Sequence, residues 1–213
     1  SSQAKVTHTT VPPARIVWMS DNTGKFVSNP NHLLGTFSGQ LSVSDTSYAT
    51  LMSSDTHQAS ILLDFGKEMY GRIKIFSAIR ECKVPVRLRI RLGESVTEAM
   101  SDVNMPDNPQ NPTNEHSLRD FTVSAPWLGS FQCGNSGFRF ARIDLLDKDI
   151  KYNLRHVSAV SLIRDIEDKG SFCSDNERIN QIWQTGAYTV KLNMQEYLWD
   201  GIKRDRLVWV GDM

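Results

Sequence analysis

The last fourteen residues hold the side chains best suited to chemistry. They read Asp-Gly-Ile-Lys-Arg-Asp-Arg-Leu-Val-Trp-Val-Gly-Asp-Met and place three carboxylates, Asp200, Asp205 and Asp212, among three cations. Glycoside hydrolysis needs one protonated carboxyl to donate to the leaving oxygen, and one ionised carboxylate to activate water or attack. Trp209 could stack on the apolar face of a sugar. The same residues also suit a charge-paired loop between helices with Trp209 in the core, so both interpretations stay open.

A long helix is predicted immediately before this segment. Ser174 and Glu177 have the spacing of a capping box, with the serine at the N-cap. Apolar or small residues then recur at helical spacing, at Ile179, Ile182, Trp183, Gly186, Ala187, Val190, Met194 and Tyr197. The pattern predicts a helix to about Trp199, with Gly201 as its stop. Because a helix cannot bury such a face alone, it must pack on the preceding domain or on further helices.

Residues 15–168 are predicted to form an antiparallel β-sandwich. Turn-rich segments separate the expected strands, which lie at 15–19, 59–65, 71–76, 84–92, 116–123, 137–145 and 154–163. The second and third of these strands are expected to form a hairpin. The apolar phase shifts between Phe140 and Ile143, which predicts a bulge. A region of this length can bury a core of its own.

The strand at residues 84–92 carries a stripe of arginines. Arg87, Arg89 and Arg91 alternate with aliphatic residues, so period two places all three arginines on one face. Such a stripe could bind an anionic ligand. The favoured interpretation is a sheet face that is solvated or paired with carboxylates.

The remaining segments offer few further sites. Residues 1–14 are expected to be a flexible lead-in. The spacing of the Asn- and Asp-rich loop at 101–114 matches no EF-hand loop, and its residues are common turn formers, so neither metal nor cofactor is expected. The three cysteines, Cys82, Cys133 and Cys173, lack metal-ligand spacing and are expected to be buried thiols, with one bridge as the alternative.

Charge and hydropathy limit the partners. The 213 residues contain 24 Lys plus Arg against 24 Asp plus Glu, without the basic excess of a nucleic-acid-binding protein. No apolar run approaches the roughly 20 residues of a membrane-spanning helix. Neither a nucleic acid nor a membrane span is therefore expected.

The C-terminal segment resembles bacterial α-L-rhamnosidases of glycoside hydrolase family 78. The family motif has the form Asp-Cys-Pro-x-Arg-(Asp)-Glu-Arg-Leu-Gly-Trp-x-Gly-Asp and follows a helix of an (α/α)6 barrel. The matching positions here are Arg204, Arg206, Leu207, Trp209, Gly211 and Asp212. Segments 62–66, 91–95 and 137–140 are similar to the β-sandwich that precedes the barrel. The resemblance therefore implies a sandwich over 15–168 and the start of the catalytic barrel over 169–213.

The resemblance also implies roles for the terminal residues. Asp205 would be the general acid of an inverting hydrolase, although the family has a longer Glu there. Asp200, Arg204, Trp209 and Asp212 would bind the rhamnose. The general base is a Glu late in the barrel, so the remaining barrel, roughly 300 residues at 20–30 per helix and loop, is expected outside this chain.

Two other readings remain. The chain could be a non-catalytic carbohydrate-binding or structural β-sandwich module, or the helix face could form an oligomer interface. These alternatives differ in whether more chain exists, because 213 residues alone would hold only half of the acid–base pair. A periplasmic or secreted location is favoured over a cytoplasmic one.

Overall fold

The computed structural model describes residues 5–35, 47–78, 84–102, 119–164 and 171–194. Its elements, in chain order, are β1 (Val6–Val11), β2 (Arg15–Met19), β3 (Val27–Ser28), the 3-10 helix η1 (Pro30–Leu34), β4 (Ala49–Ser53), β5 (Ser60–Ser77), β6 (Val86–Gly93), α1 (Val96–Met100), β7 (Asp120–Ala125), β8 (Gly129–Leu145), β9 (Ile150–Arg164) and α2 (Glu177–Asn193). Within these ranges the protein is mainly β, and all strand pairs are antiparallel.

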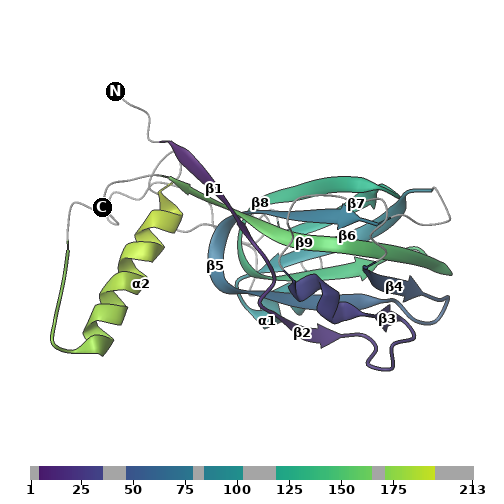
Figure 1. The fold of residues 1–213 in the computed structure, drawn as a ribbon, viewed down its shortest axis with the longest axis horizontal. Helices are drawn as coiled ribbons and strands as arrows, with labels where there is room; N and C mark the ends of the chain where they lie inside the picture. The colour runs from purple at the N-terminus through teal and green to yellow at the C-terminus, as the bar shows by residue number, and fades with distance from the viewer. Residues whose placement is uncertain (1–4, 36–46, 79–83, 103–118, 165–170, 195–213) are drawn as a thin grey trace.

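Strands β5 and β8 are long enough to take part in two layers. Residues 60–64 of β5 pair with 140–144 of β8, and residues 69–77 pair with 129–138. The register shifts between these two stretches, and β5 curves strongly along its length (Figure 1). Each long strand therefore has a first half in one layer and a second half in the other.

The strand pairs assign the other strands to these layers. One layer contains β3, β4, β9, the second half of β5 and the first half of β8, with β1 beside β9. The other contains β2, the first half of β5, the second half of β8, β6 and β7. Helix α2 lies beyond the curved part of β5, at one end of the strands (Figure 1).

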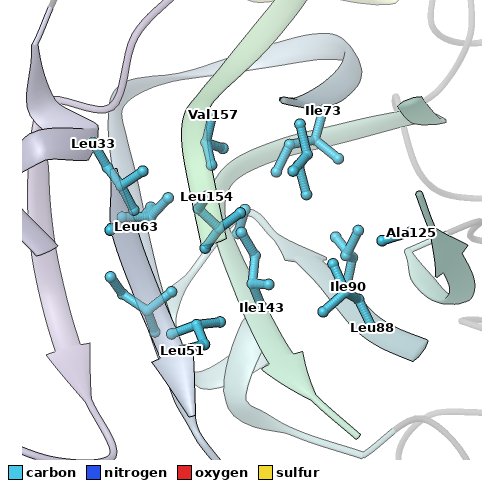
Figure 2. Packing of buried hydrophobic residues seen from close by; sticks show 14 of the residues in the cluster. Leu33, Leu51, Leu63, Ile73, Leu88, Ile90, Ala125, Ile143, Leu154 and Val157 are labelled. Atoms are coloured by element: carbon cyan, nitrogen blue, oxygen red, sulfur yellow. The ribbon is translucent and has the colours of Figure 1, made fainter. Parts of the chain in front are cut away.

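The core lies between the two layers. Ile73, Leu154 and Val157 of the first layer and Leu88, Ile90 and Ile143 of the second belong to one buried cluster (Figure 2). Burying such a side chain contributes roughly 1.5–3 kcal/mol. Two layers around one core are the sandwich-like arrangement that the sequence predicts. The predicted (α/α)6 barrel would continue past residue 194, outside the described residues.

The predicted hairpin between residues 59–65 and 71–76 is wrong, because both segments belong to the single strand β5. Gly66 has a φ of 86° and bends the strand without reversing it. Further along, a Cβ on Gly71 would stand 1.9 Å from the carbonyl oxygen of Val160. Gly71 therefore allows β9 to pair closely with β5 just after the bend.

The bulge predicted between Phe140 and Ile143 is also wrong, since the register is continuous there. The apolar phase changes because Phe140 packs on the outer face of its layer, against Leu62 and Ala99. An extra residue lies instead at Asn135, between the partners of residues 71 and 72.

The N-terminal segment is more ordered than predicted. Residues 6–11, expected within a flexible lead-in, form β1 and pair with residues 159–164 of β9. The polar composition that suggested a loose segment reflects exposure, because five of its six residues are exposed. An edge strand with its side chains in water needs no apolar alternation.

The two described cysteines differ. Cys133 is a buried free thiol, and burial raises its pKa to about 12. Cys173 is also free but exposed, which corrects the prediction that all three thiols are buried. Cys82 lies outside the described residues.

No helix of the described ranges has the length and apolar character needed to cross a membrane.

Candidate functional site

The predicted site residues fall outside the part of the chain that the structure describes. They are the proposed acid Asp205 and the proposed sugar-binding residues Asp200, Arg204, Trp209 and Asp212. Their roles stay predictions. The structure does describe the helix that leads to them and the sheet on which that helix is held.

Helix α2 begins at a different cap from the predicted one. Asn176 is the N-cap, and its side-chain oxygen accepts a hydrogen bond from the N–H of Arg178 at 3.0 Å. The hydroxyl of Ser174 accepts from the N–H of Asn176 at 3.1 Å, so the serine stabilises the preceding turn. Glu177 is then the first helical residue, where its charge suits the helix N-terminus. The helix is predicted to run to about Trp199, and the structure describes the chain only as far as residue 194.

One side of α2 is docked on the bend of β5. Tyr188 donates its hydroxyl to the carbonyl of Glu68 at 2.5 Å, and burial raises the pKa of this phenol. The ammonium of Lys67 lies 5.8 Å from the centre of the Tyr188 ring. One turn later, Leu192 joins a small buried cluster with Tyr70, Leu162 and the half-buried Val160. These contacts come from both β5 and β9.

The opposite side of α2 carries an apolar stripe. Its members are Ile179, Ile182, Trp183 and Val190, which are 43%, 63%, 39% and 51% exposed. At 100° per residue, Ile179, Trp183 and Val190 lie about half a turn away from Tyr188 and Leu192, and Ile182 lies about a quarter to a third of a turn away. Phe172, 46% exposed, stacks on Trp183 with ring centres 6.3 Å apart. The stripe is not covered by the described part of the chain.

The arginine stripe of β6 is paired with carboxylates, as the favoured interpretation predicted. The pairs are Arg87 with Asp147 at 2.9 Å, Arg89 with Asp120 at 2.7 Å and Asp102 at 2.8 Å, and Arg91 with Asp144 at 2.6 Å. Hydrogen bonding to Asp120 raises the pKa of Arg89 above its ordinary value. Arg91 and Asp144 are both almost fully buried. This stripe therefore serves mainly to hold the outer face of its layer together.

A second charged cluster, which the sequence did not reveal, centres on Asp64. Its carboxylate is 1% exposed and accepts hydrogen bonds from Arg15 at 2.8 Å and from Arg139 at 2.9 and 3.1 Å. Burial alone would raise the pKa of Asp64, but the bonds from both arginines and from the N–H of Gly66 lower it to about 2. The only sequence signal was an aspartate inside the apolar run at 59–65.

The described residues contain no group of three or more His, Cys, Asp or Glu side chains that could hold a metal ion. Most of the Asn- and Asp-rich loop lies outside them. Its described member Asp102 is paired with Arg89.

Comparison with solved structures identifies proteins of similar fold. A rhamnosidase from Klebsiella oxytoca with rhamnose bound superposes with a TM-score of 0.71 over 99% of this chain, at 18% sequence identity. The fold is shared with rhamnosidases. A GH78 family rhamnosidase of Bacillus sp. GL1 gives 0.61 over 87% of the chain at 17% identity. An α-L-rhamnosidase from Dictyoglumus thermophilum gives 0.58 over 99% at 19% identity.

This chain spans only part of the length of those proteins. It spans 40% of the Klebsiella chain, 18% of the Bacillus chain and 19% of the Dictyoglumus chain. No family model and no curated protein sequence matches it. The similarity to these proteins is therefore a similarity of fold.

Proposed function

We propose that this chain is part of an α-L-rhamnosidase-like glycoside hydrolase that removes terminal α-L-rhamnose from glycosides or polysaccharides with inversion. The observation that carries the proposal is the fold similarity to a rhamnosidase, whose match covers 99% of this chain. The sequence resemblance of that motif supports the same activity independently.

In the proposed reaction Asp205 protonates the glycosidic oxygen as the bond to the anomeric carbon breaks. A carboxylate on a further segment takes a proton from water, which attacks the opposite face of the sugar. Asp200, Arg204 and Asp212 bind the rhamnose, and Trp209 shapes the sugar pocket. Neighbouring carboxylates would keep the acid protonated, and cations beside it would oppose this.

Helix α2 gives the proposal a structural basis. Its docked side fixes the helix against the bend of β5 through Tyr188 and Leu192. Its other side offers an apolar stripe of the kind that a neighbouring helix covers in an all-helical domain. We therefore propose that α2 is the first helix of an (α/α)6 barrel, which positions the motif that follows it.

The test is hydrolysis of an aryl α-L-rhamnoside by the protein as its source produces it, after measurement of its intact mass. Release of the aryl alcohol by the wild type and its loss in Asp205→Asn, by at least a hundredfold in kcat, is the expected result. Asp55→Asn is the matched control, because Asp55 is exposed in the connection between β4 and β5. Proton NMR of the first sugar released should show the inverted anomer.

Two results would contradict the proposal. Full activity in Asp205→Asn would remove this residue from the acid role. Binding of rhamnosides without turnover, in protein of any mass, would favour the non-catalytic carbohydrate-binding module instead.

A further inference from the structure

The outer face of the layer that contains β2 has an exposed aromatic ring beside cations. Trp18 of β2 is 37% exposed, and its Cα partner Leu62 lies two residues from Asp64 on β5. Arg15 is paired with Asp64, so period two puts Trp18 and Arg15 on the same face of the sheet. The register irregularity at residue 17 preserves this shared orientation.

The arginines of this cluster keep unused donors. The side chains of Arg15 and Arg139 are 62% and 39% exposed, and both hold the buried carboxylate of Asp64. Among the described residues, the Nη1 and Nη2 groups of Arg15 and the Nη1 group of Arg139 make no hydrogen bond. Two guanidiniums against one carboxylate leave an excess positive charge, with its donors facing solvent.

A third arginine, Arg142, makes a cation–π contact with Trp18. The guanidinium carbon of Arg142 lies 5.1 Å from the centre of the Trp18 ring, and Asp144 fixes this arginine at 2.7 Å. Asp144 also binds Arg91 of β6, so this buried carboxylate, like Asp64, is shared by two arginines. The buried carboxylate of Asp64 holds the exposed guanidiniums of Arg15 and Arg139 in place, which limits the entropy lost when they bind a ligand.

We propose that Trp18, Arg15 and Arg139 form a binding site for an anionic saccharide. A sugar ring would stack on Trp18, and its carboxylate or sulfate would accept hydrogen bonds from the free guanidinium donors. Charge complementarity favours an anionic saccharide, since a neutral sugar would leave the excess positive charge of the arginines without a counter-charge. The proposal does not depend on rhamnosidase activity.

Isothermal titration calorimetry with oligogalacturonate tests the site, using maltohexaose as the neutral saccharide and sodium sulfate as the simple anion. The expected result is binding of oligogalacturonate, at least tenfold weaker in Trp18→Ala and in Arg15→Gln. The matched controls are Arg87→Gln, on a comparably exposed arginine of β6, and Trp127→Ala, between β7 and β8. Both should bind like the wild type.

The other possible results also test the proposed saccharide site. Equal binding by wild type and Trp18→Ala, or equal binding of maltohexaose, would overturn the proposal, as would an absence of oligogalacturonate binding. Dextran sulfate distinguishes a sulfate from a carboxylate ligand, and full competition by sodium sulfate alone would overturn the saccharide part. Asp205→Asn should keep full binding, so failure of this site and failure of the proposed hydrolysis are separable.

Discussion

Asp64 shows how one buried charge can organise several strands. It lies in β5, and its partners Arg15 and Arg139 come from β2 and β8. A buried carboxylate is costly to desolvate, and hydrogen bonds from cations offset this cost. Here the arginines are partly solvated, so the cost of removing the charge should be moderate.

We expect Asp64→Asn to lower the free energy of unfolding by about 2 kcal/mol, because the amide replaces charge-assisted hydrogen bonds by weaker ones. Urea denaturation measures this value, with the exposed Asp55→Asn as control. The pKa of Asp64 is lowered from 3.8 to about 2. The ionised carboxylate therefore contributes its full share to the free energy of unfolding above pH 3.8, and this contribution is lost as the pH falls toward 2. The difference between wild type and variant should shrink over that interval. A difference independent of pH would contradict the ionised state of Asp64.

His156 should make stability depend on pH in a higher range. It is 5% exposed in β9, and burial, with a smaller contribution from His32, lowers its pKa from 6.5 to about 4. Between these values the unfolded chain takes up a proton that the folded chain does not, so stability falls as pH decreases from 6.5 to 4. Melting temperatures of His156→Gln should change less over this interval than those of the wild type. His8→Gln, on the exposed strand β1, should retain the wild-type slope.

At the scale of elements, α2 combines a docked side with an uncovered one. The docked side rests on few contacts, chiefly the Tyr188 hydroxyl and the Leu192 cluster. An element held by so few buried groups opens locally at a lower free energy than the core strands.

Two substitutions on α2, two residues apart, should therefore behave differently. Leu192 is 5% exposed and Val190 is 51% exposed. Leu192→Ala should lower hydrogen-exchange protection of the α2 amides by roughly tenfold or more, because truncating a buried leucine costs about 2 kcal/mol or above. Val190→Ala should change the hydrogen-exchange protection of the same α2 amides by no more than about threefold. Equal losses would mean that the apolar stripe, too, is covered in solution.

At the scale of the whole molecule, the sequence predicts strands better than their assembly. The alternation of Val86, Leu88, Ile90 and Leu92 with arginines predicts β6 and the inward direction of its aliphatic residues, which are all buried. The bend at Gly66 was not predicted, because a glycine after an apolar run is equally typical of a turn. The Asp64 cluster was missed because its residues are 49 and 75 positions apart in the sequence. The terminal site stays a prediction.

The pairing of β9 also has a consequence for synthesis on the ribosome. Strand β9 pairs with β1, β4 and β5, and these three strands precede it by 73 residues or more, counted from Ser77 to Ile150. Until residues 150–164 have left the exit tunnel, the first layer lacks the strand that joins its edges. Until then the nascent chain must keep β1 unpaired and β4 paired with β3 alone, and chaperones would be expected to engage it at this stage.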